Sequence, residues 1–364
     1  MVYDLSRAPG TVKKIIKEHK DRKQIVEVEI KDRGLFKAIN YIPMTGRLEA
    51  GVQVVLNTTA IELGLGTGGY HFVMAVMNDS SLDDKVSFEK EYPGHIMKLR
   101  YTPCQVKTQC VEEQESKYHD LINNFKNLKG QIVVILPLHS LLAPLAITFK
   151  HFYPHGKLVY IMTEGGALPI DFSDTVNILK KKQLIDTTIT TGHAFGGDLE
   201  TVNIYTGLAA ATEIARADLV VSAMGPGITG TGTKLGYSGV ESSFVCHAVQ
   251  VLGGRVIFVP RVSMADPRQR HFGISHHSIT LLMDLIDKPV DVVFPEEYNI
   301  VKKASQLGVI KKHNAYIYDY GIIDKILSQS QFDFNSMGRG YEDDHLFFIT
   351  AGLAVLRFND MKKG

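Results

Sequence analysis

The first part of the chain carries short runs of β-branched and aromatic residues separated by turn residues. Examples of the turns are Asp32-Arg33-Gly34 and Thr45-Gly46. Runs of this kind, bounded by glycine and polar residues, are typical of β-strands. The predicted strands are Thr11–Lys17, Gln24–Ile30, Leu35–Ile42, Val52–Asn57 and Tyr70–Met77. Several short strands so close together predict a small β-barrel of the OB or SH3-like kind.

From Gln131 onward the pattern changes to short, continuously apolar stretches that alternate with longer helical ones. The predicted strands are Ile132–Leu136, Lys157–Met162, Asp186–Thr190, Asp218–Ala223, Arg255–Val259 and Val290–Phe294. The predicted helices are Ser140–Phe152, Ser173–Lys182, Leu199–Ala217, Val240–Leu252, His276–Asp287 and His345–Phe358. Apolar strands alternating with helices indicate an α/β fold, with a mainly parallel, Rossmann-like sheet flanked by helices.

The change of pattern divides the chain into three predicted regions. Residues 1–95 form the barrel domain, residues 96–130 a connecting strand and helix, and residues 131–364 an α/β ligand-binding domain. The connecting helix is predicted at Glu112–Lys129. Two domains are also what a length of 364 residues suggests.

Helix-start signals support the second domain and argue against a membrane span. Ser140 and Asp198 are predicted N-caps, and Ser238 and Glu241 have the spacing of a capping box. The nearly uncharged stretch 132–149 is long enough to resemble a membrane helix, but its prolines break it into a strand and a helix start. We therefore expect no membrane partner.

Composition narrows the classes of function. The net charge is +1, so the chain creates no strong electrostatic field that would attract nucleic acid or an anionic membrane. Basic residues between Lys13 and Lys23 are interleaved with acidic ones, which argues against nucleic-acid binding by the barrel. Cys104, Cys110 and Cys246 form no C-x-x-C pair, and no signal peptide opens the chain, so a cytoplasmic setting is expected. The sequence leaves open whether the chain forms a homo-oligomer.

Chemically active residue types concentrate in the loops that follow the predicted strands. The loops that enter the strands, such as Lys182-Gln183 and Gly253-Gly254, are short and carry no such groups. Ligands of open α/β sheets bind at the carboxyl ends of the strands, so this asymmetry predicts a site at that edge. The candidate ligand-binding residues are Ser140, Thr163, Glu164, Gly165, Gly166, Thr191, Gly196, Gly197, Gly225, Gly227, Gly230, Gly232, Thr233, Lys234, Arg261, His276 and His277.

Two glycine motifs in the loop after the fourth predicted strand come close to known phosphate-binding signatures. Gly225-x-Gly227-x-x-Gly230 follows a strand, as a dinucleotide fingerprint does, but Gly230 lies eight residues before Ser238 and no acidic residue ends the next strand. Thr233-Lys234 inverts the order of a P-loop. Two interpretations of these motifs stay open. The loop binds a small, anionic, phosphorylated or nucleotide-like ligand, or it has a purely structural role. The cofactor is unknown.

Five histidines fall on the predicted functional edge, namely His139, His193, His271, His276 and His277. The candidate catalytic residues are His139, His193 and Asp198, which would supply acid–base chemistry. An alternative for Asp198 is stabilisation of a helix start. The histidine spacing matches no metal signature, so no metal ligands are assigned. Arg261, Arg268 and Arg270 suit a phosphate or carboxylate, or form a solvated face.

Several long runs have an unusual composition, namely Leu138–Pro144, Thr163–Pro169, Thr191–Asp198, Met224–Gly227, Val55–Thr59 and Gly64–His71. In these runs the chain resembles a known bacterial family catalogued as domain of unknown function 3866. The resemblance implies a bacterial cytoplasmic protein, and it carries no activity, cofactor or catalytic residues. From the residues themselves, the leading hypothesis is an enzyme acting on a small anionic molecule. The alternatives are a non-catalytic metabolite sensor or scaffold and, third, an RNA-associated factor.

Overall fold

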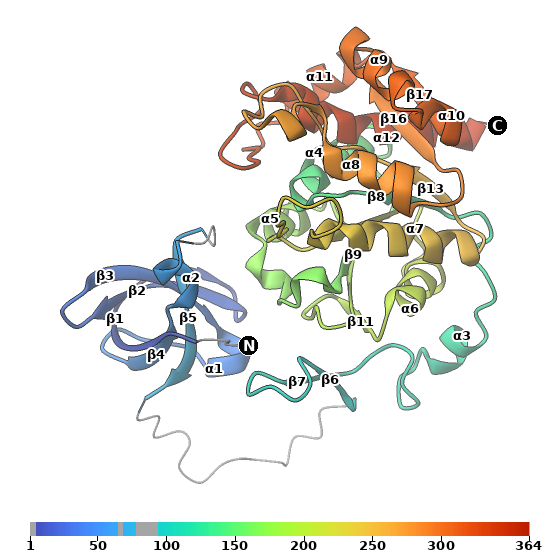
Figure 1. Cartoon of the computed structure of the whole chain (residues 1–364). Helices are drawn as coiled ribbons and strands as arrows, with labels where there is room; N and C mark the ends of the chain where they lie inside the picture. Colours follow the sequence, from blue (N-terminus) through green and yellow to red (C-terminus); the bar gives the residue numbers. More distant parts are fainter. Residues whose placement is uncertain (1–4, 65–67, 78–93, 364) are drawn as a thin grey trace. The chain divides into compact units, whose positions relative to one another are not determined.

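The computed structural model describes residues 5–64, 68–77 and 94–363. Its chain divides into two compact units. The first comprises Met1–Tyr92 with Thr102–Val106, and the second comprises Pro93–Tyr101 with Lys107–Gly364. Both units appear in Figure 1, the first in blue and the second in green to red.

The first unit is a closed five-stranded β-barrel, as the sequence predicts. Its strands are β1 (Arg7–His19), β2 (Lys23–Ile30), β3 (Gly34–Tyr41), β4 (Gln53–Asn57) and β5 (Tyr70–Val76). They pair in the order β1-β2-β3-β5-β4, and only the β3–β5 pairing is parallel among the strands described. Val26 and Val28 of β2 point inward with Leu56 of β4, which gives the barrel its own core.

The second unit is built on an eight-stranded parallel sheet flanked by helices, in agreement with the predicted fold class. Its strands are β8 (Ile132–Ile135), β9 (Leu158–Thr163), β10 (Thr187–Thr191), β11 (Leu199–Thr201), β12 (Leu219–Met224), β13 (Arg255–Phe258), β16 (Asp291–Pro295) and β17 (Asn314–Tyr318). Their order across the sheet is β11-β10-β9-β12-β8-β13-β16-β17.

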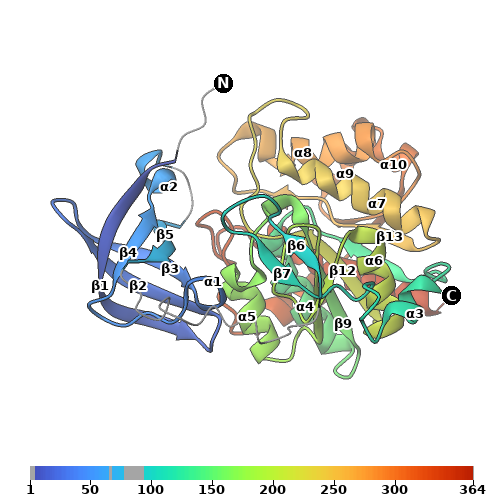
Figure 2. The same ribbon diagram turned by 90° about the horizontal axis from the view of Figure 1, so that it is seen from below.

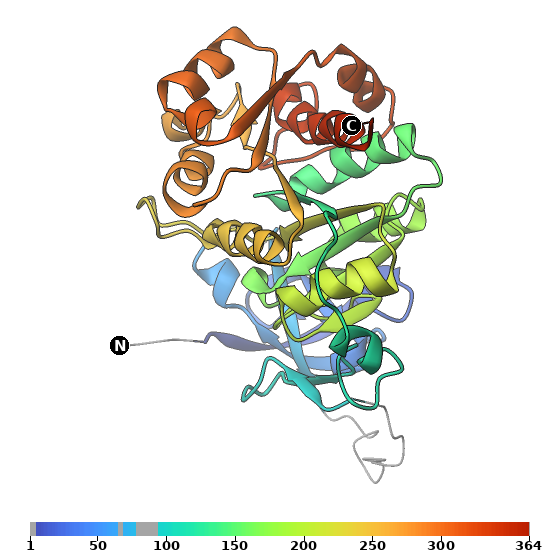
Figure 3. The ribbon, with the colours of Figure 1, turned by 90° about the vertical axis from the view of Figure 1, so that its right-hand side faces the viewer.

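Helices cover both faces of this sheet because alternate strand residues point to opposite sides. Val134 of β8 belongs to one core, with helices α4 (Leu142–Phe152), α5 (Asp174–Lys181), α11 (Gly321–Ser328) and α12 (His345–Lys363). Val133 belongs to the other, with α3 (His119–Asn123), α6 (Ile204–Ala209), α7 (Glu241–Val251), α8 (His276–Thr280), α9 (Tyr298–Gln306) and α10 (Val309–Lys312). Figure 2 shows α6 beside α7, and Figure 3 shows the red helix α12 beside the green α4. No described helix is long and apolar enough to cross a bilayer.

The prediction of a helix at Leu199–Ala217 is wrong for its first turn. Residues Leu199–Thr201 form the edge strand β11, paired with β10, and the helix begins at Ile204. Asn203, rather than Asp198, is the N-cap, and its side chain accepts hydrogen bonds from the backbone N–H groups of Tyr205 and Thr206. Tertiary pairing with the neighbouring strand outweighs the local signal at Asp198.

Three other local predictions are also wrong. The connecting helix predicted at Glu112–Lys129 is reduced to α3, His119–Asn123. Ser140 is the middle residue of a short 3₁₀ turn, His139–Leu141, so it is not an N-cap. Ser238 likewise lies in a 3₁₀ turn, and its hydroxyl accepts from the backbone N–H of Thr229 rather than from the helix that follows.

The neighbouring strands β8 and β12 form a topological switch point, because their connections pass to opposite faces of the sheet. The chain leaving β8 runs to β9 through α4, on the face whose core contains Val134, whereas the chain leaving β12 runs to β13 through α7, on the face whose core contains Val133. Connections that leave to opposite faces open a crevice above the carboxyl ends of such strands. In open α/β sheets, ligands bind at crevices of this kind.

Candidate functional site

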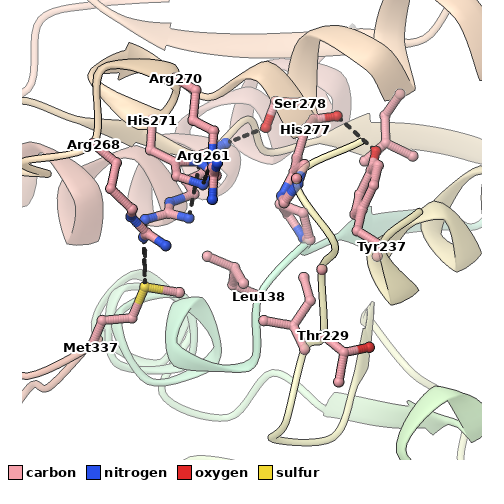
Figure 4. Close-up of a pocket in the computed structure, with 16 residues that line it drawn as sticks. Leu138, Thr229, Tyr237, Arg261, Arg268, Arg270, His271, His277, Ser278 and Met337 are labelled. Carbon is pink, nitrogen blue, oxygen red and sulfur yellow. Dashed lines mark hydrogen bonds between the residues drawn. The ribbon is translucent and has the colours of Figure 1, made fainter. Parts of the chain in front are cut away.

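A cavity of about 220 Å³ lies at the switch point (Figure 4). Leu138 comes from the segment after β8, and Thr229 and Tyr237 come from the segment after β12. Arg261 and His277 come from the segment after β13. In Figure 4 the arginines gather on one side of the cavity, with Leu138 and Thr229 opposite them. The lining is therefore basic on one side and largely uncharged on the other.

The basic side is organised around one buried carboxylate, that of Asp266, which is 3% exposed. It accepts from Arg261 Nη2 at 2.5 Å, from Arg268 Nη2 at 2.9 Å and from Arg339 Nη2 at 3.3 Å. Burial alone would raise its pKa, but the hydrogen bonds from Arg268 and the charge of Arg261 hold the pKa of Asp266 well below its ordinary value. Asp266 is therefore an anion that fixes three guanidinium groups.

A second carboxylate joins this network from a distant part of the chain. Asp344 accepts from the hydroxyl of Ser263 at 2.5 Å and from Arg339 Nε at 3.3 Å. Arg270 has no carboxylate within ion-pair distance among the described residues, and its Nε donates to the ring of His271. Four guanidinium groups are thus opposed by two carboxylates, which leaves an excess of positive charge.

Arg261 retains an unused hydrogen-bond donor. Its side chain is 4% exposed, and its Nε has no hydrogen-bond partner. Burial lowers the pKa of Arg261 to about 10, which leaves the guanidinium charged at neutral pH. A buried donor of a charged group without a partner is costly, and Arg261 is one of the residues that line the cavity.

Three histidine rings lie beside the arginines. The ring of His277 stacks on Tyr237 with centroids 3.8 Å apart and an interplanar angle of 7°. Its ring lies 4.1 Å from that of His276 and 5.1 Å from that of His271. Ser275 holds the group in place, because its hydroxyl contacts His271 Nδ1 at 2.8 Å and accepts from the backbone N–H of His277. Ser275 is thus the helix N-cap of α8.

All three rings are neutral at physiological pH. Burial, followed by the charge of Arg261, lowers the pKa of His271 to about 3. Burial, followed by His276 and the arginines, lowers the pKa of His277 to about 4, and burial with Arg270 lowers the pKa of His276. The neutrality of His276 and His277 therefore arises mainly from burial and arginine charge.

The three histidines also have the proximity of a metal-binding group, since one ring nitrogen of each lies within 4.8 Å of the others. Neutral imidazoles are good ligands for Zn²⁺. However, the arginine field that opposes a single proton on these rings would oppose a divalent cation more strongly. The electrostatics therefore favour an anion at this position.

The segment from Gly225 to Lys234 contributes to the cavity through its middle. Gly230 and Gly232 line the cavity, and Gly232 has a φ of +81°, which favours glycine. A backbone bridge between Gly230 and Tyr237 folds the segment back on itself. Gly227 also has a positive φ, of +101°, and Gly225 follows the end of β12.

Thr233 and Lys234, at the far end of this segment, do not line the cavity. Thr233 Oγ1 accepts from the backbone N–H of Gly236 at 3.1 Å. Lys234 forms an exposed ion pair with Asp284, with Nζ 2.9 Å from Oδ1. Of the seventeen predicted binding residues, those brought together at the cavity are Gly230, Gly232, Arg261 and His277, with the ring of His276 next to them.

His139 and Ser140 make internal contacts instead. His139 Nδ1 lies 3.2 Å from the hydroxyl oxygen of Tyr160, and Nε2 lies 2.6 Å from Ser173 Oγ. Burial lowers the pKa of His139 to about 4, so the ring is a neutral member of a hydrogen-bonded chain. Ser140 Oγ contacts Ser336 Oγ at 3.1 Å. Neither residue lines the cavity.

The other proposed catalytic residues, His193 and Asp198, belong to the region around β10. His193 Nδ1 accepts from the backbone N–H of Leu99 at 3.0 Å. Asp198 Oδ2 accepts from the backbone N–H of Thr188 at 2.8 Å and from Lys180 Nζ at 2.5 Å. Burial opposes ionisation, but the Lys180 contact leads the interactions that lower the pKa of Asp198. These bonds explain both residues structurally.

The remaining predicted binding residues lie at the ends of β9 and β10, away from the cavity lining. The backbone N–H of Gly165 donates to Glu241 Oε1 at 3.3 Å, and burial raises the pKa of Glu241. Gly197 packs against β10 so closely that a Cβ atom would lie 2.9 Å from Thr190 Oγ1. The others in this part are Thr163, Glu164, Gly166, Thr191 and Gly196.

Tyr237 and Met337 are among the cavity residues that sequence reasoning missed. Tyr237 could have been suspected, because it follows the glycine segment by a few residues. Met337 lies between α11 and α12, far along the chain, and no local pattern marks it. Arg268, Arg270 and His271, noted only as neighbours of the predicted site, line the cavity directly.

Comparison with known proteins identifies the family. The model of a family described as "Protein of unknown function (DUF3866)" matches residues 37–355, so the chain belongs to this family. The match confirms the resemblance seen in the sequence. A search of curated proteins finds no match.

Replacing Asp266 by Asn should destabilise the protein strongly. Breaking a buried ion pair by removing one partner typically lowers the free energy of unfolding by about 3–5 kcal/mol. The control is Asp284→Asn, which breaks the exposed pair with Lys234 and should cost about 0–1 kcal/mol. Urea unfolding of both variants measures the difference, and equal losses would contradict the organising role of Asp266.

Proposed function

We propose that this protein is an enzyme that binds a small anionic molecule, of the phosphorylated kind, in the cavity at the switch point. Arg261, Arg268 and Arg270 would hold the anionic group, and His277 would transfer a proton to or from the bound molecule. The observation that carries the proposal is the unpartnered, buried Nε of Arg261 beside an excess of guanidinium charge.

Charge and hydrogen bonding favour an oxyanion as the ligand. Guanidinium groups recognise phosphates and carboxylates through several parallel N–H donors. The two carboxylates present engage Arg261, Arg268 and Arg339, whereas Arg270 has none among the described residues. A bound dianion would supply the missing negative charge and an acceptor for the free donor.

The size of the cavity supports a small molecule. Its volume of about 220 Å³ is below the range of roughly 300–1,000 Å³ that is usual for sites of drug-sized ligands. The cavity therefore suits the phosphate or carboxylate of a small metabolite better than a whole nucleotide. Leu138, Ile228 and Leu281 would contact an apolar part of the ligand.

His277 is the best-placed group for proton transfer. It lines the cavity, and its ring nitrogens make no hydrogen bond among the described residues. Because its pKa is about 4, it is an unprotonated base at neutral pH. By contrast, His271 has both ring nitrogens in contact with Ser275 and Arg270.

A non-catalytic metabolite sensor is the second candidate, and one observation favours it. Catalytic bases are usually oriented by a third polar group, yet no described carboxylate contacts the ring of His277. Its orientation depends on stacking with Tyr237. Turnover of a bound phosphorylated compound would support the enzyme, and tight binding without turnover would support the sensor.

Sulfate is the simplest probe for the anion site. Replacing Arg270 by Gln should weaken sulfate binding about 10- to 100-fold, because hydrogen bonds to charged groups contribute about 1.5–3 kcal/mol. Lys234→Gln is the matched control, since Lys234 is a cation outside the cavity. Isothermal titration calorimetry at constant ionic strength measures both. Unchanged affinity in the Arg270 variant, or an equal loss in the Lys234 variant, would refute the assignment.

Sulfate binding should also tighten as the pH falls from about 7 to about 5. A bound dianion raises the pKa of His277 above its free value of about 4, and a ligand that raises a pKa binds the protonated form more tightly. His271, His276 and Asp266 face the same region, so His277→Gln isolates the contribution of His277. The variant should show a flatter pH dependence. An affinity of the unaltered protein that does not change with pH would contradict the proposal.

A further inference from the structure

The side chain of Met337 lies against the arginines of the proposed anion site. Its sulfur is 3.3 Å from Arg268 Nη2 and 3.6 Å from Arg261 Nη2, and Figure 4 shows it facing the guanidinium groups. The residue comes from the loop between α11 and α12, where its φ of +54° is unusual for a residue other than glycine.

A thioether is a weak hydrogen-bond acceptor, and here it faces two charged donors. Both Nη2 atoms already bond Asp266, so the sulfur occupies a second acceptor position on the cavity side of Arg261 and Arg268. An oxygen atom of a bound oxyanion would make a stronger bond at this position. Met337 and the anion therefore compete for the same donors.

We propose that Met337 is a peroxide-sensitive modification site whose sulfoxide oxygen occupies the anion position and closes the cavity to ligand. This inference rests on the proposed function of the cavity. In the reaction, the O–O bond of a peroxide breaks and one oxygen atom forms a bond to the sulfur. The sulfur is oxidised by two electrons, and hydrogen peroxide is reduced to water. The product is a polar side chain with a strong acceptor.

Exposure makes Met337 the most reactive methionine among the described residues. The residue is 48% exposed, and Met77 follows at 37%. Oxidation of methionine follows access of the oxidant to sulfur. Met77 belongs to the barrel unit and lines no part of the cavity, so it provides a matched control.

The test compares sulfate affinity before and after treatment with hydrogen peroxide, in a Cys104→Ser background because Cys104 is exposed. Oxidation should weaken sulfate binding at least about tenfold in the parent and in the Met77→Leu variant. It should leave the affinity of Met337→Leu unchanged, and methionine sulfoxide reductase should restore the parent. Peptide mass spectrometry verifies oxidation of Met337. Met337→Gln, which carries a permanent amide oxygen, should bind sulfate weakly without peroxide.

The outcomes separate this inference from the function it rests on. Equal sulfate affinity with Met337 reduced and fully oxidised would overturn the inference and leave the anion site intact. A loss of affinity in oxidised Met337→Leu as large as in the parent would also overturn it. Failure of the untreated protein to bind sulfate would refute the proposed function, and this inference with it.

Discussion

The arrangement of this site depends on a shortage of negative charge around four arginines. Asp266 binds Arg261, Arg268 and Arg339, and Asp344 binds Arg339 again, while Arg270 has no carboxylate partner among the described residues. The buried carboxylate holds the guanidinium groups together, but it does not neutralise them. Burial, with a further contribution from the same surplus, keeps the neighbouring histidines unprotonated, and the surplus opposes a metal ion; both support the anionic ligand that we propose.

The fold brings this charge to the switch point of the parallel sheet. The connections after β8 and β12 leave to opposite faces, and the segment after β13 carries the arginines and histidines to the cavity between them. The loop before α12 completes the cavity by placing Met337 on the arginines and Asp344 against Ser263. Segments distant in sequence therefore build a single cavity.

The sequence predicts the architecture of both units, but for the candidate site it predicts the edge of the sheet and only some of the residues. Strands such as Val52–Asn57 and Asp218–Ala223 can be predicted because the pattern of apolar residues within each strand reflects which of its side chains are buried. The edge of the sheet where the cavity lies also follows from the sequence, because polar loops collect there. The choice among residues on that edge depends on partners that lie far away along the chain. His139 is engaged by Tyr160 and Ser173, and Asp198 by Thr188 and Lys180. Met337 reaches the arginines only through the tertiary fold.

The most direct test of the anion site is a crystal structure of the protein with selenate, located by the anomalous scattering of selenium. We predict a peak within hydrogen-bonding distance of Arg261 and Arg268, with the sulfur of Met337 displaced from its present contacts. Selenate bound elsewhere with this cavity empty, or held only by exposed lysines, would contradict the account.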